Sequence, residues 1–168
     1  NSNTLYVGGS FYTNNSTQTI AGTTTIYING TGNVGHASFI LNVNNPLVIN
    51  TVGAVTLVNN LTIGSTFTCN NVANITVNSG HSLNYTSALT LDTNGLVFHT
   101  INSVNSNSSA TITLSSDLAS SGTFYSGGSV NTTTYSTSVS AKILISGNIT
   151  TGTVGGITGT ANIEFTGT

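Results

Sequence analysis

The sequence is almost without charge. Its formally charged residues are Lys142, Asp92, Asp117 and Glu164, and it contains no Arg, Met or Trp. A nucleic-acid-binding surface needs many basic side chains to neutralise phosphates, and one lysine cannot supply them. A polybasic membrane anchor is excluded for the same reason. No apolar run reaches the roughly 18 residues that a membrane span requires.

Cysteine and proline are equally scarce, with one residue of each. A single cysteine, Cys69, cannot form an internal disulfide, so other interactions must hold the fold together. We interpret Cys69 as a small apolar core side chain. Intrinsic disorder is not expected either, because 37% of the residues are hydrophobic and many are β-branched.

Uncharged polar residues fill the sequence instead, and 78 of the 168 residues are Thr, Asn or Ser. Such a surface is hydrated without charge and open to N-glycosylation, which indicates an extracellular protein. Covalent N-glycans are the only non-protein groups that we expect, and no cofactor is predicted. The candidate acceptors with the pattern Asn-x-Ser/Thr are Asn14, Asn15, Asn29, Asn60, Asn74, Asn84, Asn107, Asn131 and Asn148.

Short alternating runs rich in Thr, Val and Ile recur between Gly, Asn and Ser clusters, and residues that favour helices are rare. The chain is therefore predicted to be all-β. We expect an antiparallel β-sandwich of the immunoglobulin-like or pilin-like kind with an N-terminal donor strand, and a β-solenoid is the alternative. The segment Asp92–Gly95, between two apolar runs, predicts a tight hairpin turn because Asn94 and Gly95 tolerate positive φ.

A solenoid should show a constant repeat, because each coil stacks on the one before it. Candidate turns lie near Asn59-Asn60, Asn70-Asn71, Ser79-Gly80 and Asn94-Gly95. Their spacings are about 11, 9 and 15 residues, which is no fixed period. The sandwich is therefore preferred.

The N-terminal segment carries the clearest functional pattern. Leu5, Val7, Gly9 and Phe11 alternate with more polar residues and would share one face of a strand. An extended, uncharged terminal strand can leave its own domain and complete the sheet of a neighbour. Gly9 would mark a shallow pocket or a close backbone approach. We therefore divide the chain into a donor strand, residues 1–13, and a head domain, residues 14–168; the first strand of the domain itself is the other interpretation.

The alternating face with one glycine resembles the N-terminal extensions of chaperone–usher pilins. Together with the uncharged, all-β, sequon-bearing chain, it is most similar to the subunits of archaeal thread filaments. This resemblance implies a glycosylated surface filament whose subunits join head to tail by donor-strand complementation. It also implies an acidic habitat, and a chain with almost no ion pairs has little stability to lose there.

Catalytic and metal-binding patterns are absent from the sequence. The three acidic residues are scattered, and His36, His81 and His99 lack the spacing of a metal site. One covalent possibility is an isopeptide bond between Lys142 and Asn162 assisted by Glu164, which needs an apolar site that lowers the pKa of the lysine. Each such bond would remove one ammonia from the intact mass.

These observations predict a non-enzymatic structural subunit of an extracellular cell-surface filament. It would be a homopolymer of identical subunits, joined head to tail, that serves in adhesion, biofilm formation or cell–cell contact. The alternative is a secreted adhesin or binding module with a β-sandwich or β-solenoid fold that presents loops to a ligand.

Overall fold

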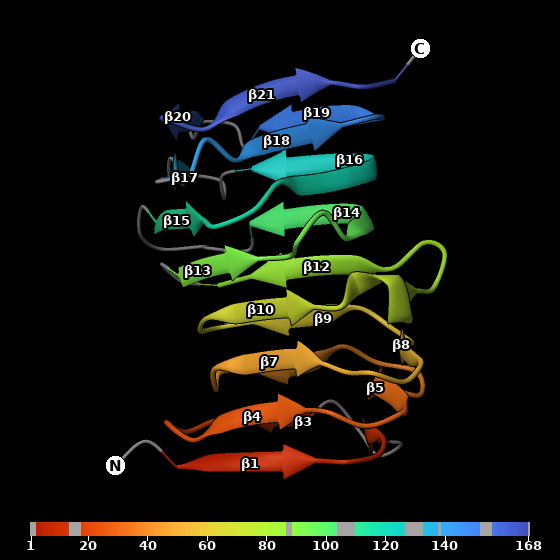
Figure 1. Cartoon of the computed structure of the whole chain (residues 1–168). Coiled ribbons are helices and arrows are strands. Elements are labelled where there is room, and N and C mark those ends of the chain that lie inside the picture. The colour runs from red at the N-terminus through yellow and green to blue at the C-terminus, as the bar shows by residue number, and fades with distance from the viewer. Residues whose placement is uncertain are drawn as a thin grey trace.

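The computed structural model describes residues 3–13, 18–86, 89–103, 110–126, 133–137, 139–151 and 156–167. In these residues the chain winds into successive coils of short strands, and the coils stack from the N-terminal end to the C-terminal end (Figure 1). Every strand pair in this part of the chain is parallel. The protein is a parallel β-solenoid, so the all-β prediction and its alternative architecture are confirmed, and the antiparallel sandwich is wrong.

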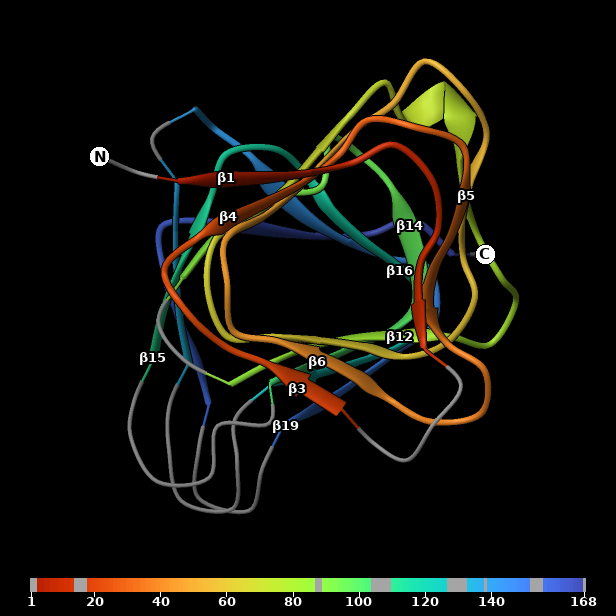
Figure 2. The same ribbon diagram turned by 90° about the horizontal axis from the view of Figure 1, so that it is seen from below.

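Three sheets run along the solenoid and enclose one core, as the view down the axis shows (Figure 2). Sheet A consists of β1 (Thr4–Val7), β4 (Thr25–Ile28), β7 (Leu47–Asn50), β10 (Phe67–Asn70), β13 (Leu89–Asp92), β15 (Ala110–Leu114), β17 (Thr133–Thr137) and β20 (Ile157–Gly159). Sheet B is shorter and consists of β2 (Phe11–Thr13), β5 (Gly32–His36), β8 (Val55–Leu57) and β11 (Ile75–Val77).

Sheet C begins opposite sheet A, where β3 and β6 face β1 and β4 across the core (Figure 2). It consists of β3 (Gln18–Ile20), β6 (Leu41–Val43), β9 (Leu61–Ile63), β12 (Ser82–Tyr85), β14 (Val97–Ser103), β16 (Leu118–Ser126), β18 (Lys142–Ile145) and β21 (Asn162–Phe165), and β19 (Asn148–Thr151) also pairs with β16. A 3-10 turn, η1 (Val72–Asn74), precedes β11. Beyond β11, the long strands β14 and β16 occupy the side of the solenoid where β5 lies (Figure 2).

The coils differ in length. Successive register partners on sheet A are Leu5, Ile26, Leu47, Phe67, Leu91 and Leu114. Their separations are 21, 21, 20, 24 and 23 residues. The length of a coil thus varies, and the first two turn spacings noted in the sequence, 11 and 9, add up to the 20 residues of the coil from Leu47 to Phe67. The repeat lies in the whole coil and not in the distance between neighbouring turns.

Like residues stack on like residues in the core. Leu41, Leu61 and Leu83 lie on successive strands of sheet C, and all three are buried. On sheet A, Ile28 and Ile49 lie in register with Cys69, which is fully buried as the sequence predicted. Each buried aliphatic side chain contributes about 1.5–3 kcal/mol of hydrophobic stabilisation.

Uncharged polar side chains join neighbouring coils at the corners. Thr51 Oγ1 donates to the Gly30 carbonyl at 2.5 Å, and Asn45 Nδ2 donates to the Thr24 carbonyl at 2.8 Å. Asn60 Oδ1 accepts a hydrogen bond from the Ser82 amide at 2.8 Å. At the corners, some backbone N–H and C=O groups do not pair with a neighbouring strand, and these side chains supply their hydrogen-bond partners. They supply a structural reason for the abundance of Asn, Ser and Thr.

The predicted hairpin at Asp92–Gly95 is a corner instead. Asn94 and Gly95 do adopt positive φ, 50° and 80°, as the turn chemistry predicted. The strands on either side, β13 and β14, belong to sheets A and C and do not pair with each other. In a solenoid the strand after a turn pairs with the coil above or below it, so an Asn-Gly turn between apolar runs does not specify a hairpin.

Candidate functional site

The N-terminal end of the solenoid is an open sheet edge. β1, β2 and β3 are the end strands of sheets A, B and C, and each pairs on one side only within the described residues. Leu5 is 50% exposed, and Val7 and Phe11 are partly buried against the core beneath them. The backbone groups on the free side can therefore accept another strand, and apolar side chains lie beside them.

The four residues of the predicted donor face lie in this first coil. Leu5 is in register with Ile26, and Phe11 is in register with Val34 of the same chain. Residues 3–13 therefore pack on the solenoid as part of it, whereas the sequence suggested a tail separate from the head. A Cβ added at Gly9 would meet no atom of the described residues within 4 Å, so this glycine makes no close approach to them.

The C-terminal end is open in the same way. Among the strands that the structure describes, β20 ends sheet A, β21 ends sheet C, and β19 pairs with β16 alone. Ile149, Ile163 and Phe165 are exposed there, and Phe165 has 62% of its surface accessible. Since all strand pairs in the described residues are parallel, the stack of coils has a direction, and its two ends are not equivalent.

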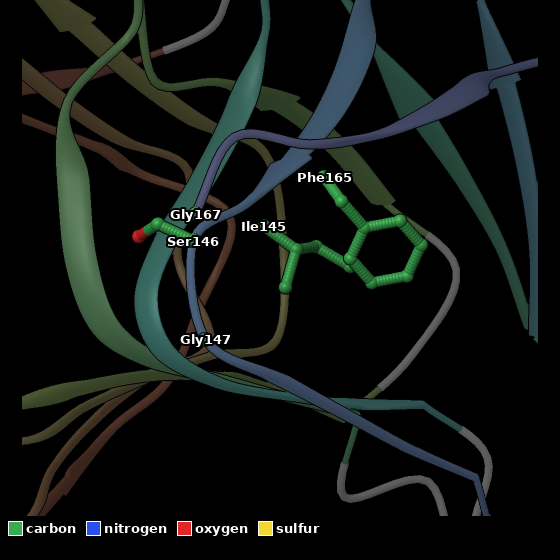
Figure 3. Close-up of a pocket in the computed structure, with 5 residues that line it drawn as sticks. All are labelled: Ile145, Ser146, Gly147, Phe165 and Gly167. Atoms are coloured by element: carbon green, nitrogen blue, oxygen red, sulfur yellow. The ribbon is translucent and has the colours of Figure 1, made fainter.

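A shallow hollow of about 220 Å³ lies at the C-terminal end (Figure 3). Ile145 and Phe165 form its apolar side, and Ser146, Gly147 and Gly167 complete it. The amide of Thr166 donates to the Ile145 carbonyl at 2.9 Å and holds the end of β21 against β18.

The predicted glycosylation acceptors differ in exposure. Asn29, Asn74 and Asn148 are exposed, and Asn60 is half-buried with its Oδ1 occupied by the Ser82 amide. Asn84 is 6% exposed, and its amide nitrogen donates to Thr62 Oγ1 at 3.3 Å. The other acceptors lie outside the described residues: Asn14, Asn15, Asn107 and Asn131.

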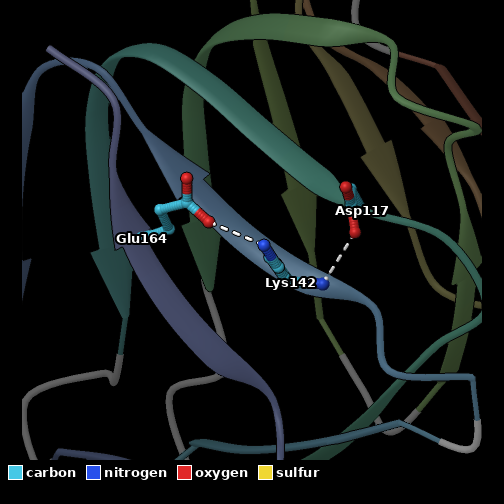
Figure 4. Close-up of polar contacts among 3 residues, drawn as sticks. All are labelled: Asp117, Lys142 and Glu164. Carbon is cyan, nitrogen blue, oxygen red and sulfur yellow. Dashed lines mark hydrogen bonds and ion pairs between the residues drawn. The ribbon is translucent and has the colours of Figure 1, made fainter.

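The structure brings the three residues of the isopeptide hypothesis together, but in a polar setting. Figure 4 shows Lys142 between the carboxylates of Glu164 and Asp117. Lys142 is the register partner of Asn162, and its Nζ lies 2.8 Å from Glu164 Oε2. The side chains of the ion pair are 46% and 51% exposed. The hydrogen bond and charge of Glu164, with a smaller effect of Asp117, raise the pKa of Lys142. The bond requires a lowered pKa, so this site is an exposed ion pair that lacks the apolar surroundings of the hypothesis.

His36, His81 and His99 do not form a metal site in the part of the chain that the structure describes, where no group of three potential ligands gathers. His36 is buried, and its Nδ1 accepts hydrogen bonds from the amides of Ser38 and Phe39, both at 3.0 Å. Burial, with the nearby charge of Asp92, raises the pKa of the Cys69 thiol, which makes it a poor nucleophile.

Sequence reasoning missed the C-terminal residues of the candidate site. Ile163 and Phe165 alternate with Asn162 and Glu164, which is a strand pattern like that of many other segments. Nothing in that pattern distinguishes an end coil from an inner coil, because exposure depends on whether another coil follows.

Comparisons with protein-family models, with curated proteins and with solved structures found no match to this chain. Among the described residues, no helix has the length and apolar character needed to cross a membrane.

Proposed function

We propose that the chain is the structural subunit of an extracellular surface filament that grows head to tail and serves in adhesion, biofilm formation or cell–cell contact. The observation that carries the proposal is the pair of open, apolar solenoid ends. Each end offers three strands with a free edge, β1, β2 and β3 at one end and β19, β20 and β21 at the other. Exposed parallel edges of this kind pair with further strands unless something covers them.

Head-to-tail addition of identical subunits would continue the sheets from one subunit to the next. The contact is heterologous, because the N-terminal end of one subunit meets the C-terminal end of another, and such contacts propagate into fibres. In this arrangement residues 1–13, the predicted donor strand, stay in their own subunit. Leu5 and Phe11 remain in the first coil, and the free strand edge beside them pairs with the next subunit. This differs from the strand exchange that the pilin resemblance implies.

An extracellular setting and a non-enzymatic role belong to the same proposal. The surface is uncharged and polar, and Asn29, Asn74 and Asn148 are accessible for glycans. Neutral corner hydrogen bonds hold the coils together, and the one ion pair in the described residues, Lys142 with Glu164, is solvent-exposed and adds little. No cofactor and no partner other than further copies is required.

Electron microscopy and sedimentation of the purified chain test the proposal. Leu5→Asp places a charge at the N-terminal end and should abolish filaments, because the charge would be buried in the joint. Phe165→Asp should do the same at the other end. Val52→Asp is the matched control, since Val52 is 89% exposed but lies at a corner between sheets A and B.

Mixing the two blocked subunits sharpens the test. A Leu5→Asp subunit keeps a working C-terminal end, and a Phe165→Asp subunit keeps a working N-terminal end. Their mixture should therefore give dimers and no longer species. A wild-type chain that stays monomeric, or a Leu5→Asp chain that still forms filaments, would contradict the proposal.

A binding module is the second candidate, and one surface feature favours it. The rings of Tyr6 and Tyr27 lie together on the outer face of sheet A with centroids 5.4 Å apart. The Asn50 amide donates to the Tyr27 hydroxyl at 2.5 Å, and Asn71 donates to Asn50 at 2.9 Å. Aromatic faces beside amides suit a polar ligand such as a sugar. A monomeric wild-type chain would favour this function.

A further inference from the structure

Two tyrosines and a candidate glycan acceptor share one patch on the outer face of sheet A. Tyr6 and Tyr27 are register partners on β1 and β4. Asn29 follows Tyr27 by two residues, and its amide donates to the Val7 carbonyl at 3.1 Å, so the pairing of the two strands continues as far as Asn29. Ile28 between them is buried, and side chains two residues apart in a strand point to the same face. Tyr27 and Asn29 therefore lie side by side on the outside of the solenoid.

The first coil leaves an empty place beside Asn29. Gly8 follows Tyr6 by two residues and lies in the register position next to Asn29. A Cβ added at Gly8 would meet no atom of the described residues within 4 Å. Paired strands lie about 4.8 Å apart, and residues two positions apart in a strand lie about 6.6 Å apart. Tyr6, Gly8, Tyr27 and Asn29 thus form a small rectangle, and the corner at Gly8 is open.

A hydrogen bond holds the Tyr27 ring beside Asn29. Asn29 and Asn50 each follow one residue after the register partners Ile28 and Ile49, so Asn50 lies next to Asn29 on the following coil. The Asn50 Nδ2 donates to the Tyr27 hydroxyl at 2.5 Å. The Tyr27 side chain therefore leans along its strand toward the position of Asn29, and its ring is fixed at both ends.

Tyr6 enlarges this aromatic surface. Its ring lies on the Tyr27 ring with centroids 5.4 Å apart and an interplanar angle of 54°. Tyr6 is 66% exposed, so much of its ring can contact a ligand. No formally charged side chain precedes Asp92 in the sequence. A neutral ligand with C–H groups on one face and hydroxyls at its rim, which is a sugar ring, matches such a surface.

We infer that the first sugar of a glycan on Asn29 folds back over Gly8 and packs on the rings of Tyr6 and Tyr27. This inference rests on the glycosylated extracellular chain of the proposed function and names the place where one of its glycans lies. The pattern Asn29-Gly30-Thr31 makes Asn29 an acceptor, and its exposed side chain borders the open corner. The contact orders a sugar that the covalent bond already holds in place, so it needs little further binding energy.

A free sugar is the other source of the same chemistry, because the two tyrosines are also the surface that favours a binding module. A tethered sugar has a high effective concentration at the rings, whereas a free sugar must lose its translational freedom to bind there. The glycan on Asn29 should therefore occupy the surface and exclude a free sugar from it. The two sources can be separated by comparing glycosylated and unglycosylated chains.

Melting temperatures test the contact. Secretion from a eukaryotic host and trimming with an endoglycosidase leave one N-acetylglucosamine on each occupied asparagine, and expression in the bacterial cytoplasm leaves none. The loss caused by Asn29→Gln should be greater in the glycosylated chain by about 2–4 °C, as expected for one aromatic contact in a chain of this length. In a Tyr6→Ala background this difference should fall by at least half. Asn74→Gln is the matched control, because residues 69–79 contain no aromatic side chain, and its effect should not depend on Tyr6.

Two results of this experiment would overturn the inference. One is a glycosylated chain in which glycopeptide analysis finds the sugar on Asn74 but none on Asn29. The other is an effect of Asn29→Gln that is the same with and without Tyr6.

Nuclear magnetic resonance gives a direct readout. The sugar on Asn29 should show nuclear Overhauser contacts to the rings of Tyr6 and Tyr27, and its ring protons should shift upfield relative to those of the sugar on Asn74. Tyr27→Leu should remove both signals. Free N-acetylglucosamine should perturb the two tyrosines in the unglycosylated chain and leave them unchanged in the glycosylated chain. Equal perturbation in both chains would show that the surface serves an external sugar and would overturn the inference.

Filament formation is scored separately by electron microscopy. Filaments without the contact between sugar and tyrosine would contradict this inference and leave the proposed function intact. A glycosylated chain that shows the contact but forms no filament would contradict the proposed function alone.

Discussion

The hydroxyl groups of Tyr85 and Tyr135, fifty residues apart in the sequence, hydrogen-bond to each other inside the solenoid. Their rings are nearly perpendicular, at 87°, with centroids 6.5 Å apart, and Phe124 packs beside Tyr135 at 5.7 Å. Tyr85 lies on sheet C and Tyr135 lies on sheet A, so this pair ties the two long sheets together through the core. A polar pair in an apolar core is stable only while each hydroxyl retains its partners.

Removing one hydroxyl of this pair should lower the free energy of unfolding by more than half of the loss that follows when both hydroxyls are removed. Tyr85→Phe deprives the Tyr135 hydroxyl of a partner in the core, and we expect a loss of about 1–3 kcal/mol in the free energy of unfolding. The double variant Tyr85→Phe/Tyr135→Phe should lose less than the sum of the two single losses, because no hydroxyl is left behind. Urea unfolding of all four chains gives the coupling energy. Additive losses would show that the hydroxyls do not interact.

Stability should fall in alkali. Burial, followed by the charge and hydrogen bond of Tyr135, raises the pKa of Tyr85 well above its usual value. Above the ordinary tyrosine pKa of about 10, the unfolded chain releases this proton while the folded chain retains it. The folded state therefore loses stability as the pH rises past about 10, and this residue adds no pH dependence at lower pH.

The raised pKa of Lys142 acts in the same alkaline range, because a lysine held protonated by Glu164 contributes stability that is lost only when it deprotonates. Unfolding measurements from neutral pH to about pH 12, with tyrosinate absorbance followed in parallel, test both residues. A Tyr85→Phe chain should show a weaker decline. An equal decline in the two chains would rule out Tyr85 as a cause.

A methyl group at Gly30 should separate the first two coils. A Cβ at this position would overlap the backbone carbonyl of Gly8 on the coil below, whereas a Cβ at Gly8 would meet nothing within 4 Å. Gly30→Ala is therefore expected to cost about 1–3 kcal/mol, as overpacking does, and Gly8→Ala should be nearly neutral. Thermal unfolding of the two variants measures the difference. Equal melting temperatures would mean that the coils can move apart without cost.

Glycan occupancy should follow exposure. Asn29, Asn74 and Asn148 are accessible, whereas a glycan on Asn84 would require the loss of its bond to Thr62 and the exposure of a buried amide. Glycopeptide mass spectrometry of the protein from its native source should find glycans on the first three and none on Asn84. Full occupancy of Asn84 would show that this part of sheet C is open when the glycan is attached.

The strands and the turn conformation were predictable from the sequence, but the pairing of the strands into a solenoid was not. Composition predicted strands, and the Asn94-Gly95 pair predicted positive φ at a turn, both of which the structure confirms. An inward-outward alternation such as Leu89–Leu91 is the same in a sandwich and in a solenoid, because side chains alternate across a strand in either fold. Which strand pairs with which is decided by contacts about 20 residues apart. Unequal coil lengths hid this repeat, as the change from 20 residues between Leu47 and Phe67 to 24 between Phe67 and Leu91 shows.

Part of the candidate site was likewise predictable from the sequence, and part was not. The alternation of Leu5, Val7 and Phe11 identified an apolar strand face before the fold was known. Its partner, the end at Phe165, could not be found from the sequence because every inner strand shows the same pattern. Exposure of Phe165 follows from stacking order, which is a property of the whole chain.

The direction of the backbone hydrogen bonds has a mechanical consequence. In each sheet they run from coil to coil, along the long axis of the solenoid (Figure 1). Tension along a filament would therefore load every coil-to-coil contact in series, and the weakest contact would fail first. Inner coils are joined by sheet pairing, stacked side chains and corner hydrogen bonds together. In the proposed filament, the joint between subunits would have the fewest of these contacts, so an overstretched filament should break into whole folded subunits that can join again.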